Sequence, residues 1–392
     1  MGYKKFIVPL FLVMALMGQS QTICKKSKKV QKYMVENAVI AHRGTIFWAP
    51  ELTEAAFRWA RNTGSDYLEL DVQRSKDGVL IIMHDRTFNR TTDVAQKFPG
   101  REKDFVDTFT FEEIMTLDAG SAFNKNNPGQ ARPSFVGQEV LVFEDVFRIA
   151  EGKKIKRKQD GSRVFHKNDM GHYVFEYEQD IPISGHQPGI YIETKIPEQY
   201  PGMEEQIYQE LARIGWNPLE GKKIRKNEPF YLNGKVNIAN TRGKILIQTF
   251  THPGMMNFKR VFKQEVLTSF LVGNSKSNDF AKPEVRKELI HFAIESGAQF
   301  IGTNIGDSND GLSSQFSEEI HAAGLKANAY SFNTDEQMGK YFGPLKGQKA
   351  APLLDGMITN RADLTTLFYH NREVRKFKSS QTPEEILKEL GY

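Results

Sequence analysis

Short apolar runs alternate with amphipathic segments along most of the chain, from residue 38 to residue 370. The apolar runs have the length of buried strands, and the amphipathic segments have the spacing of helices. Strands are predicted at 38–41, 67–72, 189–194, 244–249, 267–272, 298–303, 325–331 and 354–358. Helices are predicted at 54–61, 143–150, 203–214, 254–264, 284–296, 314–323, 334–341 and 362–369. Because eight parallel strands with helices between them can close on themselves, the pattern predicts one α/β domain, residues 38–370, with a (β/α)8 TIM barrel.

One apolar run does not fit that rhythm. Residues 79–83 are a ninth candidate strand, and only residues 73–78 connect it to the strand before it. A parallel crossover needs a dozen or more residues, so this strand is expected to fold back as a hairpin partner or to join the barrel irregularly. An open doubly wound sheet is the alternative fold, but the chain lacks a Gly-x-Gly-x-x-Gly phosphate loop to support it.

Residues 152–188 interrupt the barrel pattern and predict an insertion at the protein surface. A basic run from Lys153 to Lys158 precedes Asp160-Gly161, which is a hairpin turn signal. We therefore expect a β-hairpin near the barrel mouth. The basic run could favour a membrane surface, although no amphipathic apolar face accompanies it. Three histidines in the insertion match no metal-ligand spacing, which argues against a second metal site: His166, His172 and His186.

The start of the chain has the features of an export signal. Residues 1–20 combine a lysine pair, an apolar core of 12 residues and small residues before a cleavage point expected after Ser20. This pattern predicts a secretory signal peptide and a periplasmic protein. A lipid anchor on Cys24 is disfavoured, because Ile23 before it is not a small residue. Residues 21–37 are basic at their centre and are expected to form a loose linker.

The end of the chain, residues 371–392, is expected to leave the barrel as a tail. The sequence Thr382-Pro383-Glu384-Glu385 is a capping box with proline at the first helical position. A short helix docked on the barrel is therefore predicted there.

Composition excludes several functional classes. The chain of 392 residues is 39% apolar and 26% charged, as in ordinary globular proteins. Its net charge of +5 is too small and too dispersed to predict nucleic acid binding. The single cysteine excludes an intramolecular disulfide. After the leader no apolar stretch reaches 18 residues, so no transmembrane helix is expected.

Polar residues gather at the ends of three predicted strands. His42-Arg43-Gly44 follows strand 38–41, Glu69 and Asp71 share one face of strand 67–72, and His84-Asp85 ends run 79–83. Each motif alone has a common structural explanation. Two carboxylates on one face repel each other unless a cation lies between them, and Ca²⁺ or Mg²⁺ suits oxygen ligands. The co-occurrence of the three motifs at strand ends therefore predicts an active site.

These motifs resemble the signature of the glycerophosphodiester phosphodiesterase family, which shares a barrel fold with phosphatidylinositol-specific phospholipases C. The resemblance covers about residues 38–370. The family usually has Asn, Trp and Asp where this chain has Leu52, Tyr330 and Asn360, and these departures are expected to affect substrate contacts rather than the metal and histidine set. The matching motifs are His42-Arg43-Gly44, Pro50-Glu51-x-Thr53, Glu69-x-Asp71-Val72, Lys76-Asp77-Gly78, His84-Asp85, Ile192-Glu193-Thr194-Lys195, Gln248-Thr249-Phe250, Tyr330-Ser331-Phe332-Asn333 and Asp355–Asn360.

The resemblance implies a metal-dependent hydrolase that converts small glycerophosphodiesters to sn-glycerol 3-phosphate and an alcohol. It favours Ca²⁺ over Mg²⁺ as the metal. By similarity to the phospholipase branch, the first histidine is expected to be the general base and the second the general acid. The implied site residues are His42 and His84 for catalysis, Arg43 and Lys195 for the substrate phosphate, and Glu69, Asp71 and Glu193 for the metal.

Several alternatives stay open. Glu51 either orients a metal ligand or His42, or only favours a helix N-terminus electrostatically. The attacking group is either a glycerol hydroxyl, which would give a cyclic phosphate, or water. The rival functions are a phospholipase of C or D type acting on membrane lipid, and a catalytically silent barrel that binds headgroups. The intact histidines and acids argue against the silent barrel.

Overall fold

The computed structural model describes residues 22–180, 187–219, 243–306, 311–342, 353–375 and 379–392, together with the backbone of two short paired strands, β9 (Tyr231–Leu232) and β10 (Lys235–Val236). The export signal expected at residues 1–20 lies outside the described residues. None of the described helices is long and apolar enough to cross a bilayer.

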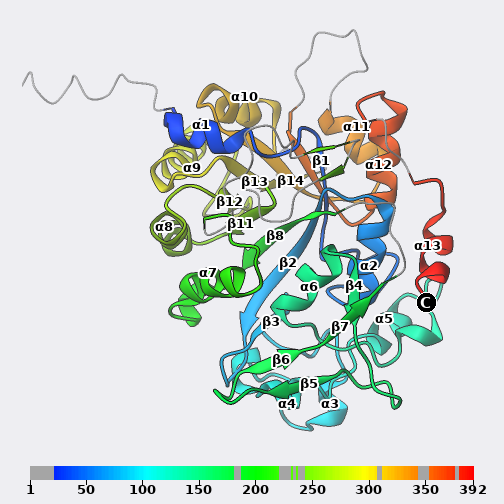
Figure 1. Ribbon diagram of the computed structural model, residues 1–392. Coiled ribbons are helices and arrows are strands. Elements are labelled where there is room, and N and C mark those ends of the chain that lie inside the picture. Colours follow the sequence, from blue (N-terminus) through cyan, green and yellow to red (C-terminus); the bar gives the residue numbers. More distant parts are fainter. Residues whose placement is uncertain are drawn as a thin grey trace, which may run out of the picture.

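Eight parallel strands form a closed barrel, as the sequence pattern predicts (Figure 1). β1 pairs with β15 on one side and with β2 on the other, and this second pairing closes the ring. The strands in chain order are β1 (Ala38–Ala41), β2 (Tyr67–Arg74), β8 (Gly189–Thr194), β11 (Ile245–Thr249), β12 (Leu267–Val272), β13 (Phe300–Asn304), β14 (Lys326–Phe332) and β15 (Gly356–Thr359).

The extra strand β3 (Leu80–Ile82) folds back on β2 in antiparallel register, with Val72 opposite Ile82. The hairpin interpretation of this run is therefore correct. Because β2 extends beyond the barrel to make this pairing, the chain that follows β3 begins close to the carboxyl end of β2.

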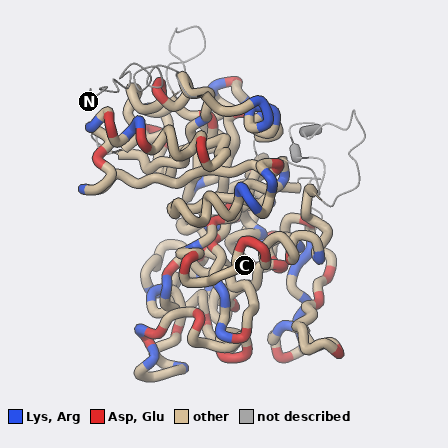
Figure 2. The backbone as a smooth tube through the Cα atoms, turned by 90° about the vertical axis from the view of Figure 1, so that its left-hand side faces the viewer, with Lys and Arg blue, Asp and Glu red and all other residues tan. Residues whose placement is uncertain are grey.

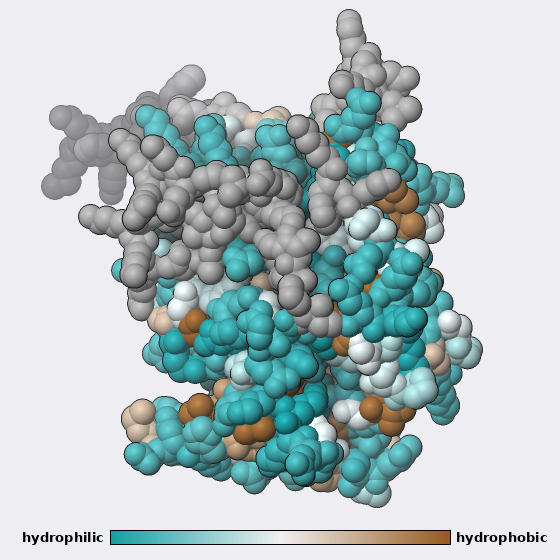
Figure 3. Space-filling view, turned by 45° about the vertical axis from the view of Figure 1, so that its right-hand side comes forward, coloured by the Kyte–Doolittle hydropathy of each residue, from teal (hydrophilic) through white to brown (hydrophobic). Residues whose placement is uncertain are grey.

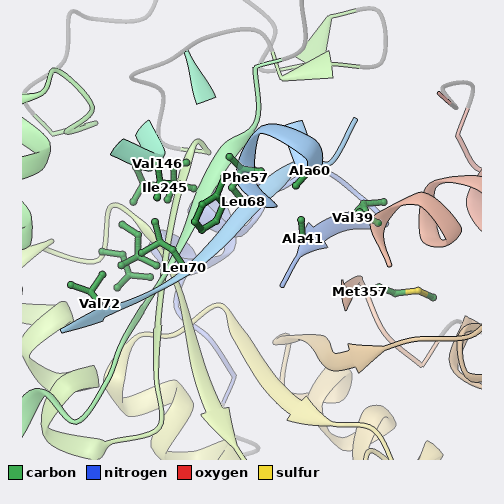
Figure 4. Packing of buried hydrophobic residues seen from close by; sticks show 14 of the residues in the cluster. Val39, Ala41, Phe57, Ala60, Leu68, Leu70, Val72, Val146, Ile245 and Met357 are labelled. Carbon is green, nitrogen blue, oxygen red and sulfur yellow. The ribbon is translucent and has the colours of Figure 1, made fainter. Parts of the chain in front are cut away.

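Helices surround the barrel and cover the outward side chains of its strands. Leu68, Leu70 and Val72 of β2 belong to this outer hydrophobic cluster, and Figure 4 shows Leu68 beside Phe57 of α2. Each such side chain contributes about 1.5–3 kcal/mol when it is fully buried. The covering helices are α2 (Glu54–Thr63), α6 (Phe143–Ala150), α7 (Met203–Arg213), α8 (His252–Val261), α9 (Pro283–Ser296), α10 (Ser314–Ala322), α11 (Asp335–Phe342) and α12 (Ala362–Asn371).

The barrel interior is apolar at the amino ends of the strands and polar at their carboxyl ends. Tyr67 and Tyr191 meet edge to face in the apolar layer, with ring centroids 6.1 Å apart. Two residues further along the same strands stand Glu69 and Glu193, which are also buried. The period of two along a strand therefore separates a packed base from a charged mouth.

The prediction that residues 21–37 form a loose linker is wrong. Lys25–Gln31 form a helix, α1, which lies across the amino end of the barrel, far from the insertion lobe in Figure 1. Ser27 Oγ donates to Gly297 O at 3.3 Å, and Gln31 Nε2 donates to Gln299 O at 3.0 Å. Val30 is buried in the apolar layer of the barrel. Tertiary docking thus orders a segment whose closely spaced lysines disfavour an isolated helix.

The insertion forms two antiparallel pairs, as the hairpin prediction requires: β4 (Lys153–Ile155) with β7 (Tyr177–Gln179), and β5 (Phe165–Lys167) with β6 (Tyr173–Phe175). Phe111 packs against Phe165, Tyr173 and Phe175, so the hairpin joins the loops after β3 in one lobe. The short helices of this lobe and elsewhere are α3 (Val94–Lys97), η2 (Val106–Thr108), α4 (Phe111–Ile114), α5 (Ser121–Asn126), η3 (Pro133–Phe135) and η4 (Pro197–Gln199).

The basic run of the insertion is neutralised by acids. Lys154 and Lys156 of this run pair with Glu178 and Glu176 of the facing segment at 3.0 and 2.8 Å. Figure 2 shows basic and acidic positions interspersed over the lower part of the molecule, where the insertion lies. His166 and His172 are exposed, and His186 lies outside the described residues. The insertion contributes nothing to the metal-capable cluster found among the described residues.

The tail docks on the barrel through α13 (Pro383–Glu389), and the predicted capping box is present at Thr382. Trp59 of α2 donates from Nε1 to Pro383 O at 3.2 Å, and Arg58 donates to the hydroxyl of Tyr392 at 2.9 Å. The last residues therefore cover α2 instead of extending into solvent.

A buried ion-pair triad fastens the end of the insertion to α2. Asp180 accepts hydrogen bonds from Arg58 Nε at 2.8 Å and from Arg61 Nη2 at 2.5 Å, and its carboxylate is fully buried. Burial alone would raise the pKa of Asp180, but the two guanidinium groups lower it below its usual value. The triad is therefore most stable with the carboxylate ionised.

We predict that Asp180→Asn lowers the free energy of unfolding by about 3–5 kcal/mol at neutral pH, because it leaves two buried guanidinium groups uncompensated. The folded-state pKa is depressed, so this stability is present above the unfolded pKa of about 4 and is lost as the pH falls through the folded value. Denaturant unfolding at neutral pH and near pH 3 measures both effects.

The matched control is Glu178→Gln, which breaks an exposed ion pair and should cost only about 0–1 kcal/mol. Equal stability of Asp180→Asn and the wild type at neutral pH would contradict the role of the triad.

Candidate active site

Three carboxylates meet inside the carboxyl end of the barrel. Asp71 of β2 lies directly opposite Glu193 of β8 in the strand register, and Glu69 is two residues before Asp71 on the same face. One oxygen from each acid lies within 4.8 Å of one from each of the others, and all three residues are buried. Acids from two distant parts of the chain therefore converge on one point, as the motif analysis predicts.

Burial and mutual repulsion disturb these carboxylates strongly. The pKa of Glu69 is raised well above its usual value by burial and by the charges of Asp71 and Glu193. Burial also raises the pKa of Glu193, although Lys195 opposes it. Burial would raise the pKa of Asp71 as well, but Lys195 and Arg43 lower it to about 2. Ionisation of all three acids is therefore unfavourable unless a further cation lies among them.

Lys195 lies among the acids. Its ammonium is 3.0 Å from Asp71 Oδ1 and donates a hydrogen bond to Glu193 Oε1, so it pairs with two carboxylates rather than with Glu193 alone. The same ammonium lies 5.9 Å from the ring centroid of Phe250 at the rim of the mouth.

The His-Arg-Gly motif forms a tight turn at the end of β1. Arg43 adopts a left-handed conformation, φ 53°, and its backbone N–H donates to Glu69 Oε2 at 2.8 Å. Its guanidinium lies 3.5 Å from Asp71 and 3.1 Å from Glu51. Gly44 follows at φ 75°, where a Cβ atom would approach Ala56 to 2.8 Å. The spacing of the motif is thus fixed by close packing against α2.

His42 is buried and held by Asn360. Asn360 Nδ2 donates to Asn333 Oδ1 at 2.8 Å, which orients the Asn360 carbonyl oxygen toward His42 Nδ1 at 2.6 Å. This arrangement assigns the proton to Nδ1 and leaves Nε2 as an acceptor. Burial and the Arg43 charge lower the pKa of His42 to about 4, so the imidazole is neutral at pH 7. A neutral ring with a free Nε2 can accept a proton.

His84 has a different environment. It follows β3, its side chain is about one-third exposed, and its Nδ1 donates to Asp85 Oδ1 at 2.6 Å. Burial tends to raise the pKa of Asp85, but hydrogen bonds from His84 and Arg90 lower it, so this carboxylate stays ionised. Because Asp85 engages Nδ1, Nε2 is the ring nitrogen left to exchange a proton with a substrate.

Sequence reasoning missed four polar contacts of the site. Gln248 of β11 donates from Nε2 to Glu69 and Glu193, at 3.4 Å each. Asp85 and Arg90 extend the contacts of His84 outward. Asn360 was expected to affect substrate contacts only, and that is wrong because it holds His42. The motif Gln248-Thr249-Phe250 near the end of β11 marked Gln248 without giving it a role, whereas a loop residue such as Arg90 gives no such signal.

Glu51 carries ion pairs with Arg43 and Arg90, and Thr53 is the residue that caps α2. Thr53, and not Glu51, therefore makes the capping hydrogen bond at the N-terminus of α2. The departure at Leu52 places a leucine at φ 58°, a left-handed conformation that asparagine adopts more readily. The departure at Tyr330 places a hydroxyl that donates to Val272 O at 2.9 Å.

Known proteins share this fold. A solved structure of a putative glycerophosphoryl diester phosphodiesterase from Silicibacter pomeroyi DSS-3 aligns with a TM-score of 0.59 at 17% identity, covering 89% of this chain and 99% of that one. An Oleispira antarctica phosphodiesterase in complex with the product sn-glycerol-3-phosphate aligns with a TM-score of 0.53 at 19% identity, covering 86% and 98%. These likenesses establish the fold.

The sequence comparisons identify the family, which the fold likeness alone does not. A glycerophosphodiester phosphodiesterase of Bacillus subtilis (strain 168) is 26% identical over 329 residues, which cover 83% of this chain and 84% of that protein. The model of the glycerophosphoryl diester phosphodiesterase family matches residues 42–364, from the first histidine into α12. With most of its length inside that match, this chain belongs to the glycerophosphoryl diester phosphodiesterase family, whose members are phosphoric diester hydrolases.

Proposed function

We propose that this protein is a metal-dependent enzyme that hydrolyses small glycerophosphodiesters to sn-glycerol 3-phosphate and an alcohol. The observation that carries the proposal is the gathering of Glu69, Asp71 and Glu193 at the barrel mouth. The residue after His42 and the residue before His84 both contact the acids: Arg43 N–H donates to Glu69 Oε2 at 2.8 Å, and Met83 N–H donates to Asp71 O at 3.0 Å. A phosphodiester bound at this point would have cations, an acid and a base within reach.

The donor set fits a hard divalent cation. Both carboxylate oxygens of Asp71 are buried without an accepted hydrogen bond, although Lys195 and Arg43 lie nearby as ion pairs. Buried carboxylate oxygens without hydrogen bonds are stabilised by a bound cation, and Glu69 and Glu193 would complete the protein ligands of that cation. Ca²⁺ is preferred to Mg²⁺ in the proposal because it tolerates irregular, carboxylate-rich oxygen geometry. When bound, the metal supplies positive charge that offsets charge on the phosphoryl oxygens.

The two histidines divide the proton transfers. His42, neutral and with Nε2 free, removes the proton from the attacking hydroxyl, which belongs to the substrate glycerol or to water. His84, oriented by its hydrogen bond to Asp85, donates a proton from Nε2 to the leaving alkoxide. Different environments for two similar groups are what separates a base from an acid at one pH. Arg43 and Lys195 bind the phosphate through their charges.

Action on membrane lipid is the rival function, and the surface gives it little support. The lysines that suggested a membrane-facing insertion are paired with glutamates. Figure 3 shows hydrophilic residues over most of the described surface on that face, with apolar residues scattered in small groups. A lipid-docking surface would combine positive charge with an apolar face.

We predict that purified protein with Ca²⁺ releases sn-glycerol 3-phosphate from glycerophosphocholine and that a chelator abolishes this release. His42→Ala and His84→Ala should each lower kcat by at least ~10²-fold, the usual scale for loss of an acid or a base. His166→Ala, an exposed histidine of the insertion, is the matched control and should leave kcat unchanged. Cleavage of phospholipid vesicles without cleavage of the soluble diester would instead support the rival.

Metal binding can be measured without turnover. Isothermal titration of Ca²⁺ should show that Glu69→Gln and Glu193→Gln weaken binding at least ~10-fold, since even outer-shell changes cost that much. Glu51→Gln removes a carboxylate of the same mouth that lies outside the three-acid cluster, so its affinity should stay within a few-fold of the wild type. Equal affinity of all three variants would refute the ligand assignment.

Export of the enzyme to the periplasm is part of the proposal. Its support is the charged start, apolar core and small residues of segment 1–20. The expected result is that N-terminal sequencing of the protein from a periplasmic fraction begins at Gln21. A protein that retains Met1, or one that carries lipid on Cys24, would contradict this prediction.

A further inference from the structure

Arg90 makes more contacts than its position on an exposed loop would suggest. Its side chain is about half exposed, yet it forms two bidentate ion pairs at once. Nε and Nη2 donate to the two oxygens of Asp85 at 2.6 and 3.0 Å. Nη1 and Nη2 donate to the two oxygens of Glu51 at 2.9 and 2.6 Å. Two-sided bidentate pairing holds a guanidinium plane in one orientation.

These contacts join the two halves of the proposed site. On one side, Asp85 accepts the hydrogen bond of His84 Nδ1. On the other side, Glu51 pairs with the guanidinium of Arg43 at 3.1 Å. A continuous series of charged contacts thus runs from the proposed acid to the proposed phosphate-binding arginine, with Arg90 at its centre.

The His84 ring depends on this series for its orientation. Among the contacts of the described residues, its single side-chain hydrogen bond is the one to Asp85. Asp85 is itself only partly buried, and Arg90 donates to both of its carboxylate oxygens. Without Arg90, the carboxylate could rotate into solvent and the imidazole would follow it.

We propose that Arg90 is a positioning residue that holds His84, through Asp85, in place to protonate the leaving alkoxide. This inference rests on the proposed function. In that step the attacking oxygen forms its bond to phosphorus and the bond between phosphorus and the leaving oxygen breaks. The electron pair of the broken bond goes to the leaving oxygen, which takes the proton from His84 Nε2. The role therefore concerns the departure of the alcohol and not the binding of the phosphate.

The chemistry of the leaving group separates this role from simple structural support. Choline is a poor leaving group and needs a proton as it departs. The much more acidic 4-nitrophenol departs as its anion without one. Misplacing the acid should therefore slow the first substrate and spare the second, whereas damage to the metal, the phosphate contacts or the fold would slow both.

The test compares Arg90→Ala with the wild type, each saturated with Ca²⁺, on glycerophosphocholine and on the 4-nitrophenyl diester of glycerophosphate. We expect kcat for the choline diester to fall ~10- to 100-fold, less than the ~10²- to 10⁴-fold that loss of a general acid costs because His84 itself is retained, and kcat for the nitrophenyl diester to change less than about 3-fold. KM for both should change little, and Arg90→Lys should restore part of the loss because lysine keeps the charge but not the fork.

Arg86→Ala is the matched control. This arginine lies on the same loop and is exposed, but it stacks on Phe105 at 4.2 Å and binds Gln199, outside the series. Its variant should turn over both substrates normally. Asp85→Asn is nearly isosteric and provides a second test should Arg90→Ala fail to fold, and it should reproduce the same selective loss.

An equal loss on both substrates, or no loss on either, would overturn the positioning role while leaving the proposed function standing. Failure of the wild type to hydrolyse either diester with metal present would overturn both.

Discussion

Three buried carboxylates at one end of the barrel are the constraint that the rest of the site satisfies. Glu69, Asp71 and Glu193 lie close enough to repel one another strongly in a region removed from water. Two cationic side chains of the protein partly balance this charge: Arg43 in the turn after β1, and Lys195 two residues after Glu193. Because such burial is unfavourable without a counter-charge, the cluster makes physical sense as a divalent cation site.

The barrel makes this concentration of charge possible. Its strands place apolar rings at their amino ends and acids at their carboxyl ends, so a packed base supports a charged mouth. α1 closes the opposite end of the barrel, and α13 covers α2. The apolar core elsewhere in the barrel offsets the repulsion among these acids. The mouth can therefore hold both the carboxylates that a metal needs and the cations that a phosphate needs.

The two histidines occupy unequal surroundings, and that inequality fits their proposed roles. His42 is buried, next to a guanidinium, and bonded to a neutral amide, so it resists protonation. His84 is partly exposed and bonded to a carboxylate that Arg90 keeps ionised. The hairpin of β2 and β3 brings His84 to the edge of the acid cluster, because β3 returns along the same strand that carries Asp71.

The sequence by itself determined the barrel, its eight strands and the convergence of the acids and the first histidine. Hydrophobic periodicity is local, and parallel βα units leave few ways to close. The direction of each strand then decides which residues face the mouth.

Tertiary structure alone decided the rest. The ordering of α1, the pairing of the insertion's lysines with glutamates, the hold of Asn360 on His42 and the bridge formed by Arg90 all join residues far apart in the chain. No local pattern encodes such partners. Their geometry exists only once the barrel has brought separate loops to the same rim, which is why a loop arginine gave no signal in the sequence.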